Sequence, residues 1–185
     1  MSIITNKTIP KEIQDKVYEA LKFFPSLAKT PIEFKFKKNI KKSTMQAQPK
    51  FSTIFRGKRS RCYMIFISEK FKISGAELST RDIPHDVFVG WIGHELGHVM
   101  DYENMNNLQL VWFGFKYILL ENHIIHAERK ADHYAVKQGM EAYILKTKNF
   151  ILNHADITET YKKRIKRYYL SPEEIMQLVS ERHRE

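Results

Sequence analysis

Two histidines and a glutamate lie inside an apolar segment at residues 91–102, and this combination constrains the fold more than any other feature of the chain. The segment reads WIGHELGHVMDY. His94 and His98 are four residues apart, which places them about 40° apart on one face of a helix, and Glu95 is turned by about 100° from His94. Burial of these side chains requires a partner for each polar group. The segment therefore predicts either a core helix whose histidines bond to carbonyl groups or a metal site.

A second pair of ionisable side chains has the same spacing in the segment HAERKADHY at residues 126–134. Glu128 and Asp132 are four residues apart and share one face of a predicted helix. Taken alone, such a charged segment is typical of a solvated helix face. Beside the first motif, we prefer the interpretation that Glu128 is a third metal ligand and that Asp132 accepts the free ring N–H of a ligating histidine. Ala127 and Ala131 are small, which suits a close approach of two helices.

The side chains available as ligands indicate which metal the site would bind. The chain has one cysteine, Cys62, so a thiol-rich zinc site is excluded. Zinc takes imidazole and carboxylate ligands in about four positions, and a catalytic site leaves one of these positions for water. His94, His98 and Glu128 therefore predict one catalytic Zn²⁺ ion.

The succession of HELGH and ERKAD resembles the gluzincin zinc metallopeptidases, especially the minigluzincins, which are small soluble relatives of the CAAX-prenyl endopeptidase family. The resemblance covers about residues 86–140 and implies a zincin-like fold, in which an active-site helix and a glutamate helix pack beside a small sheet. It also implies that a strand before the active-site helix pairs with an extended peptide substrate. The segment RCYMIFIS, at residues 61–68, is the candidate for that strand.

The resemblance assigns roles to five residues. His94, His98 and Glu128 are implied as zinc ligands. Glu95 is implied as the general base, and Asp132 as the partner of His94. The expected activity is hydrolysis of a peptide bond in a protein or peptide substrate. Zinc would lower the pKa of its bound water toward about 7, and Glu95 would pass the proton of this water to the leaving amine.

The residue that stabilises the developing oxyanion is less clearly indicated by the sequence. Such a residue is a hydrogen-bond donor placed near the reacting carbonyl. The candidates are Tyr134, His133, His154, Tyr161 and Arg164. The remaining histidines are interpreted as surface or core residues: His85, His123 and His126. His126 lies about 200° from Glu128 around its helix and should point away from the metal.

The length of 185 residues predicts a single domain spanning residues 1–185, and the low counts of 7 Gly and 6 Pro favour a helix-rich fold. Helical spacing marks residues 10–24, strand patterns mark residues 32–38 and 61–68, and residues 43–57 are compatible with a strand pair or a loop. We expect an α+β fold with a small mixed or antiparallel sheet packed on a helical half. The N-terminal helix and sheet should occupy about residues 1–80, and the helical part about residues 86–185.

Helix boundaries are marked by capping residues. Asp86 is placed to cap the active-site helix. Gly139 should end the glutamate helix, which is expected over residues 122–139. Ser171 and Glu174 form a capping-box pattern that predicts the start of the last helix.

The most apolar part of the chain is LQLVWFGFKYILLE, at residues 108–121, which is apolar almost all round and predicts a central helix. Its apolar core is too short to span a bilayer and contains Lys116, so a buried helix is preferred and a membrane-surface helix is the alternative. The first residues show no secretory signal. We therefore expect a chain without a transmembrane segment, located in the cytoplasm.

The net charge of +10 is concentrated in three basic clusters, at residues 35–42, 56–61 and 162–167. Such clusters can bind nucleic acid, acidic lipid or acidic protein, whereas a solvated face is the simpler interpretation. The alternative function is therefore a nucleic-acid-associated or regulatory protein with a structural or latent zinc site. In a latent enzyme, residues 35–51 or 180–185 would block the cleft.

Overall fold

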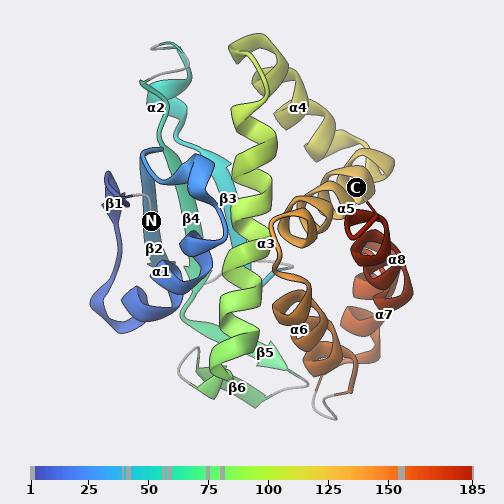
Figure 1. Cartoon of the computed structure of the whole chain (residues 1–185). Coiled ribbons are helices and arrows are strands. Elements are labelled where there is room, and N and C mark those ends of the chain that lie inside the picture. Colours follow the sequence, from blue (N-terminus) through green and yellow to red (C-terminus); the bar gives the residue numbers. More distant parts are fainter. Residues whose placement is uncertain are drawn as a thin grey trace.

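The computed structural model has an α+β fold, as expected, with a small sheet on one side of a long helix and a group of helices on the other (Figure 1). The structure describes residues 3–38, 40, 43–55, 57, 60–73, 76–79, 82–153 and 157–184, and among these the side chains of residues 71–78 are not described. The helices are α1 (Gln14–Lys22), α2 (Phe51–Ile54), α3 (His85–Glu103), α4 (Asn107–Leu119), α5 (Glu121–Lys137), α6 (Glu141–Asn153), α7 (Glu159–Tyr168) and α8 (Pro172–Arg182), with 3₁₀ turns at Lys11–Ile13 and Pro25–Leu27.

The main sheet is mixed and has the strand order β1-β2-β4-β3. Its strands are β1 (Lys7–Thr8), β2 (Ile32–Lys37), β3 (Met45–Pro49) and β4 (Tyr63–Ser68). β4 pairs in parallel with β2 and in antiparallel with β3, so β4 is an inner strand and β3 is an edge strand. A separate antiparallel pair, β5 (Lys70–Ile73) and β6 (Ala76–Ser79), precedes α3 and was not predicted from the sequence.

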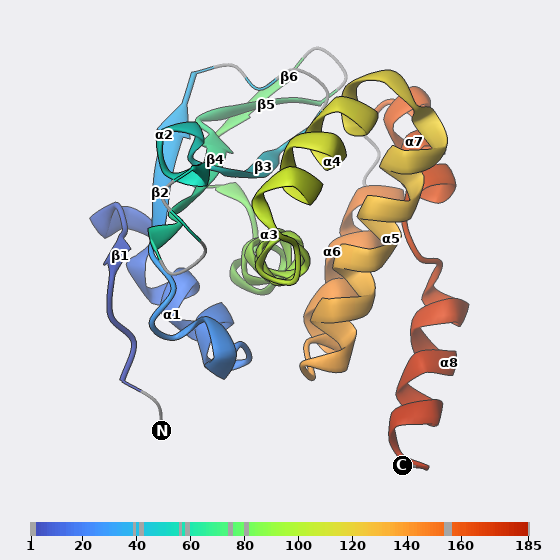
Figure 2. The same ribbon diagram turned by 90° about the horizontal axis from the view of Figure 1, so that it is seen from above.

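The long helix α3 lies at the centre of the molecule. Figure 2 shows it in end view, between the sheet and the α5–α6 layer. Its length agrees with the prediction, but the predicted cap is wrong, because α3 follows Pro84 and no side chain caps it. Asp86 instead forms an ion pair with Lys146 of α6.

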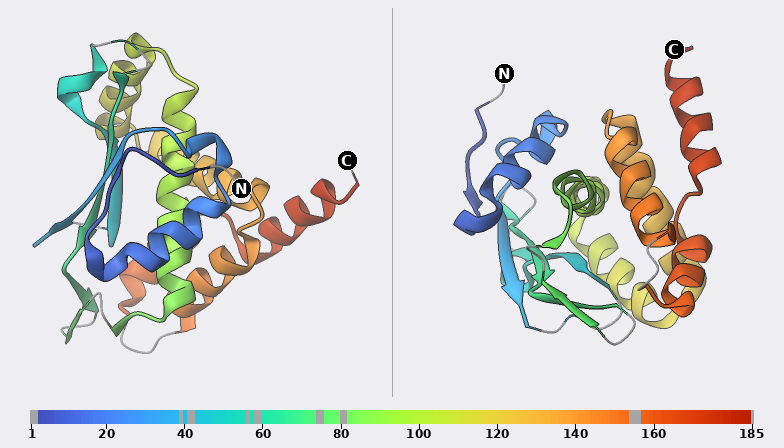
Figure 3. Two further views of the ribbon diagram at one scale, coloured as in Figure 1. Left: turned by 60° about the vertical axis from the view of Figure 1, so that its left-hand side comes forward. Right: turned by 90° about the horizontal axis from the view of Figure 1, so that it is seen from below.

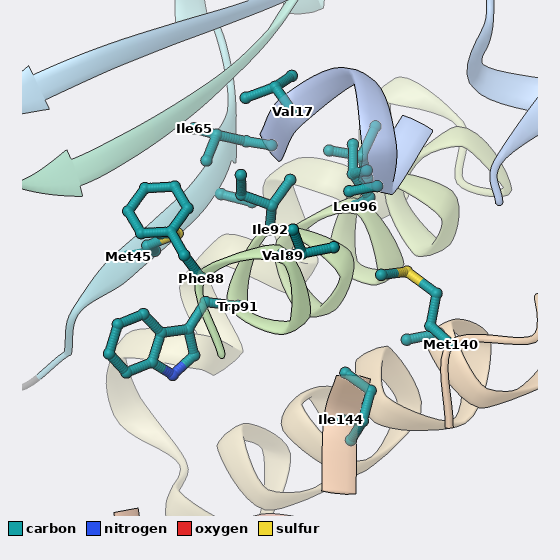
Figure 4. Close-up of a cluster of buried hydrophobic side chains, with 14 of the residues drawn as sticks. Val17, Met45, Ile65, Phe88, Val89, Trp91, Ile92, Leu96, Met140 and Ile144 are labelled. Atoms are coloured by element: carbon teal, nitrogen blue, oxygen red, sulfur yellow. The ribbon is translucent and has the colours of Figure 1, made fainter. Parts of the chain in front are cut away.

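Apolar side chains from the sheet, α1, α3 and the following helices meet around α3, as the labelled residues in Figure 4 show. Ile65 of β4 pairs with Phe34 of β2 and Ala47 of β3, and all three side chains are buried. Ile92 and Leu96 of α3 have no exposed surface. Burial on several sides leaves His94, Glu95 and His98 with less than a tenth of their surface exposed.

Helices α5 and α6 pack against the other side of α3, and the helices that follow them place the C-terminus away from the sheet (Figure 3). The chain breaks from helix at Leu120, where φ and ψ are −121° and 111°, so α4 and α5 are separate. α5 ends where Gly139 takes a φ of 92°, in the left-handed region that glycine readily adopts. The capping box of Ser171 and Glu174 starts α8, as predicted.

The expectation of a central helix over residues 108–121 is wrong. α4 lies at the periphery, and only one of its faces is covered: Leu110 is buried, whereas Trp112 and Phe115 are 55% and 54% exposed. Apolar residues on every face of a helix lead to burial only when neighbouring elements cover every face. The described elements cover only one face of α4.

Candidate metal centre

Helix α3 contributes two histidines and a glutamate to one buried point of the molecule. His94, Glu95 and His98 are 8%, 6% and 5% exposed. The rings of His94 and His98 are 4.8 Å apart between centroids and nearly perpendicular. The four-residue spacing therefore places both imidazoles on the same side of the helix, as the sequence predicts.

Helix α5 crosses α3 at this point and brings Glu128 to the two rings. The Glu128 Oε2 atom lies 3.0 Å from His94 Nε2 and 3.5 Å from His98 Nε2. The three side chains offer ligand atoms that all lie within 4.8 Å of one another, in a buried site. Two imidazole nitrogens and one carboxylate oxygen facing a common point form a donor set that suits a divalent ion such as zinc.

The close crossing of α3 and α5 depends on small residues. Gly97 packs against the backbone of Ala131, and a Cβ at Gly97 would lie 2.3 Å from the Ala131 carbonyl oxygen. Ala127 and Ala131 are buried in the same interface. The small side chains noted in the sequence therefore do lie where the two helices approach.

Asp132 lies one turn beyond Glu128 and contacts the other nitrogen of His94. Its Oδ1 atom is 2.9 Å from His94 Nδ1, and its Oδ2 atom accepts hydrogen bonds from Lys148 Nζ at 2.7 Å and from the Leu170 N–H at 3.0 Å. Burial alone would raise the pKa of Asp132, but Lys148 and His94 outweigh it and lower the pKa to about 2. Asp132 therefore faces His94 as a carboxylate.

Lys148 is a site residue that the sequence analysis missed. It is 4% exposed, and its ammonium also lies 4.7 Å from the centre of the Tyr169 ring. Its helix contains one other lysine, Lys146, and nothing in the local sequence separates the two. Only the packing of α6 against α3 and α5 brings it to Asp132.

Tyr117 of α4 is the second missed residue. Its hydroxyl donates a hydrogen bond of 2.6 Å to Glu128 Oε1, the oxygen that does not face the histidines. Burial and the Glu128 charge raise the pKa of Tyr117, so the phenol remains a donor. This hydrogen bond holds one carboxylate oxygen and leaves Oε2 directed at the rings.

His94 links the two carboxylates. Burial lowers the pKa of a histidine, but the hydrogen bonds to Asp132 and Glu128 outweigh it and raise the pKa of His94 to about 10. The pKa of Glu128 is lowered well below its usual value, because His98 and His94 outweigh the effect of burial. The protonated His94 ring thus bonds to Glu128 through Nε2, a nitrogen that would have to lose its proton to serve as a metal ligand.

Glu95 points to the sheet rather than to Glu128. Its Oε2 atom accepts a 2.6 Å hydrogen bond from the Ala47 N–H of β3, and Tyr102 donates a 3.3 Å hydrogen bond to the Ala47 carbonyl. Burial raises the pKa of Glu95. Ala47 therefore turns its backbone groups away from β4 and toward α3.

The candidate for a substrate-binding strand, residues 61–68, is contradicted by this arrangement. β4 is bonded to β2 on one side and to β3 on the other, so its backbone groups are used within the sheet. β3 is the edge strand beside Glu95. Residues 43–57, which the sequence left as a strand pair or a loop, contain this edge strand.

A cavity of about 40 Å³ lies beside His94 and Glu95, between α3, β3 and the helices α6 and α7. Trp91, Ile144 and Ile151 form part of its apolar wall. Tyr161 and Tyr169 also line it, and the Tyr169 ring lies 5.2 Å from the His94 ring. The cavity therefore places an apolar wall beside His94 and Glu95.

The residues considered as hydrogen-bond donors to the oxyanion differ in whether they reach the cavity. Tyr161 lines the cavity, and burial raises its pKa to about 12. The Tyr134 hydroxyl instead accepts a hydrogen bond from Asn104, His133 is exposed, and Arg164 stacks over the Tyr168 ring. His154 lies outside the described residues.

The other histidines do not join the three ligand candidates. His126 is exposed, and the His123 ring packs against Phe113 with a centroid distance of 4.7 Å. His85 forms a second group with Glu19 and Asp86 at the surface. The acidic members of that group are already engaged, Glu19 by the Tyr143 hydroxyl and Asp86 by Lys146, and the buried group is the stronger candidate for a metal site.

The basic clusters are partly used within the fold. Lys35 pairs with Glu33, and Arg167 pairs with Glu121. Arg61 is only 2% exposed. Residues 39, 41, 42, 56, 58 and 59 of these clusters lie outside the described residues.

The two segments considered as blocking a latent site lie in different places: part of residues 35–51 borders the candidate centre, where Thr44 and Met45 line the cavity and Ala47 bonds to Glu95. Residues 45–49 are β3, a strand of the main sheet. Arg182, near the C-terminal end, pairs with Glu141 and bonds to the Val136 carbonyl. The described part of the C-terminal segment is therefore held against α5 and α6.

No family model, curated protein or solved structure matches this chain in the comparisons with known proteins. Within the described residues, no helix has the length and apolar character needed to cross a membrane.

Proposed function

We propose that this protein is a zinc metallopeptidase with a zincin-like, gluzincin-type centre, in which His94, His98 and Glu128 bind the ion. The observation that carries the proposal is the convergence of these three buried donors from two separate helices. A structural core would leave Glu128 and Asp132 as two buried carboxylates around one histidine, an arrangement that is costly without a specific role. The Asp132–His94 contact matches the support that ligating histidines usually have.

The roles of the chain's own groups follow from their positions. A bound zinc ion acts as a Lewis acid and lowers the pKa of a coordinated water toward about 7. Glu95 is buried and has a raised pKa, which suits a base that takes a proton near neutral pH and returns it to the leaving amine. The Ala47 N–H orients the Glu95 carboxylate, and Tyr161 is the best-placed hydroxyl for the developing oxyanion.

The edge of β3 supports an extended peptide as the substrate. The Thr44 carbonyl accepts a hydrogen bond from Ser68 of β4, and the Lys50 N–H donates to Cys62 just before β4, so the alternate residues Met45 and Ala47 direct their backbone groups away from the sheet. The Ala47 N–H and carbonyl bond to Glu95 and Tyr102 in the substrate-free protein, so a peptide that pairs with this edge would replace these two hydrogen bonds, with the apolar cavity available for a small apolar side chain.

The first test is metal content. Purified wild-type protein should contain about one zinc per chain by elemental analysis, and Glu128→Ala should lose it while retaining its circular dichroism spectrum. Glu121→Ala, at an exposed glutamate of the same helix, is the matched control and should keep the metal. A wild-type protein that binds no zinc would end the proposal.

The second test separates metal binding from catalysis. Glu95→Gln should keep zinc and lose hydrolysis of unfolded casein by about 100-fold or more, because the amide cannot accept the proton. Glu159→Gln, at an exposed glutamate on α7, should retain wild-type activity. Hydrolysis by Glu95→Gln at the wild-type rate would remove Glu95 from the mechanism.

A further inference from the structure

Helix α4 presents a wide apolar face to solvent. Most of the exposed large hydrophobic side chains in the described residues lie on this helix and the residue after it, at Leu108, Val111, Trp112, Phe115, Ile118, Leu119 and Leu120. Leu108 and Ile118 are 79% and 82% exposed. A contiguous apolar surface of this kind marks an interaction site, because scattered single residues are the normal pattern.

The exposed residues form one stripe along the helix. Leu108, Val111, Trp112 and Phe115 follow the three- and four-residue spacing of a single helical face. The opposite face is used inside the protein, where Phe113 packs on Tyr102 and Tyr117 bonds to Glu128. The inner face holds α4 in place, so the outer stripe is exposed in the folded protein and does not result from fraying.

Positive charge lies next to this stripe. Glu121, directly after Leu120, bonds to both Arg167 and Tyr168 at the end of α7. α7 carries the basic cluster 162–167, in which Lys163, Lys166 and Arg167 are exposed. Figure 2 shows α4 and α7 on the same side of the molecule, with the first turn of α5 between them.

We propose that the outer face of α4 and the basic cluster of α7 bind together to the surface of an anionic lipid bilayer. α4 lies in the bilayer interface and does not cross it. Its stripe is convex and has only the Trp112 indole N–H as a side-chain hydrogen-bonding group, which suits the boundary between acyl chains and headgroups. Lys116 lies 5.3 Å from the Trp112 ring centre, so its charge can reach the headgroups from beside the apolar stripe.

A bilayer fits these observations better than a protein partner does. The apolar surface is a protruding helix rather than a groove, and polar groups for a specific hydrogen-bonded rim are few on it. Exposed lysine and arginine on the adjacent helix complement anionic headgroups. The inference is independent of peptide hydrolysis, because vesicle binding requires neither the metal nor Glu95.

Sedimentation with vesicles tests the proposal. The wild-type protein should bind vesicles of phosphatidylcholine with about 30% phosphatidylserine, and bind pure phosphatidylcholine vesicles at least about tenfold more weakly. Trp112→Glu/Phe115→Glu should reduce binding to the anionic vesicles by at least about tenfold. Met176→Glu, at a side chain on α8 that is 52% exposed, is the matched control and should bind as wild type does.

A second pair of variants separates the α7 cluster from net charge. Lys163→Glu/Lys166→Glu and Lys22→Glu/Lys29→Glu change the charge equally, but the second pair lies near α1. Only the first should weaken binding to anionic vesicles. Equal loss in both variants would show that overall charge is responsible and would overturn the assignment to α7.

Tryptophan fluorescence gives an independent readout, because the chain has two tryptophans and Trp91 is buried. The emission should shift to shorter wavelength when anionic vesicles are added, and Trp112→Phe should remove the shift while retaining binding. Failure of the wild-type protein to sediment with anionic vesicles would overturn the proposal. So would a wild-type dimer in light scattering that Trp112→Glu/Phe115→Glu converts to a monomer while vesicle binding is unchanged, since α4 would then contact a second copy.

Discussion

At the residue scale, the candidate centre is a chain of charged contacts that runs from Lys148 through Asp132 and His94 to Glu128. Lys148 and the Leu170 N–H hold one oxygen of Asp132, and the other oxygen faces His94 Nδ1. His94 Nε2 then faces Glu128. Each group fixes the orientation of the next, so the geometry around His94 is determined by buried partners on α5 and α6 and in the segment before α8.

The chain of contacts predicts that zinc binding releases a proton. The metal-free His94 has a pKa of about 10, so at about pH 7.5 its ring is protonated and must lose this proton before Nε2 can bind a metal. Zinc affinity should rise by about tenfold per pH unit between about pH 6.5 and 8.5, below the pKa of the metal-free ring. Calorimetric titration in buffers with different ionisation enthalpies should show about one proton released.

Asp132→Asn provides the control for that measurement. Removing the carboxylate charge lowers the pKa of His94, so fewer protons should be released per zinc ion at the same pH. The variant should also bind zinc more weakly, by about 10- to 100-fold, because the ring loses its oriented partner. Zinc binding by the wild-type protein without any proton release would contradict the protonated state of His94.

At the scale of elements, the centre exists because α3 and α5 cross at a distance that only small residues allow. Gly97 lies against the backbone of Ala131, and this contact sets how far Glu128 reaches toward the histidines. The glycine of the HELGH segment, Gly97, is therefore explained by helix packing rather than by chemistry. The spacing of small residues in the sequence indicated this crossing, and the structure supplied the distance.

Gly97→Ala should disrupt both stability and the centre. A Cβ at this position would lie 2.3 Å from a backbone oxygen that no side-chain rotation can move, so the helices must separate. We expect a loss of about 1–3 kcal/mol in the free energy of unfolding, measured by urea denaturation, together with weaker zinc binding. Gly114→Ala on α4 is the control, because no atom lies within 4 Å of its Cβ position, and it should stabilise the protein by about 0.5–1 kcal/mol. Equal effects of the two changes would contradict the role of the crossing.

α4 shows why an apolar pattern did not predict the position of a helix. Apolar residues occur on every side of it, a pattern typical of a central helix. In the structure its inner face packs on Tyr102 and His123 through Phe113, and no described element covers the outer face. The same pattern is compatible with burial in protein or with contact to lipid, and the sequence contains no information that separates the two.

At the scale of the whole molecule, Arg61 connects the sheet to the turn between α3 and α4. Its guanidinium donates hydrogen bonds to Asn107 Oδ1, to the Met105 carbonyl and to the Tyr102 carbonyl. In the sequence Arg61 is one of several basic residues at 56–61, which were interpreted as a solvated face or an anion site. Its burial corrects that interpretation for this residue.

Arg61→Met should destabilise the whole protein. Methionine fills a similar space but removes the arginine donors to Asn107 Oδ1 and the Met105 carbonyl and one of the donors to the Tyr102 carbonyl, so the free energy of unfolding should fall by about 3 kcal/mol in urea denaturation. Arg167→Met is the matched control, because Arg167 is 62% exposed in its ion pair with Glu121 and should contribute about 1 kcal/mol or less. A similar small effect for both arginines would show that Arg61 does not join the two halves.

The sequence by itself determined the local features of this protein. Periodicity and spacing were enough to place His94 and His98 on one helical face, and Glu128 and Asp132 on another, since these relations depend on residues four apart. Capping chemistry located the start of α8 in the same way, whereas the prediction from Asp86 failed because Lys146, distant in the sequence, binds that carboxylate.

Only the tertiary structure decided which of these features meet. The edge position of β3, the reach of Tyr117 and Lys148 into the centre and the open face of α4 all depend on contacts between distant segments. Such contacts arise from the packing of whole helices and strands. The residues that flank a lysine in the sequence therefore do not distinguish a lysine at the candidate centre from one at the surface. The residues of the candidate centre were therefore partly predictable, and the environment that sets their charges was not.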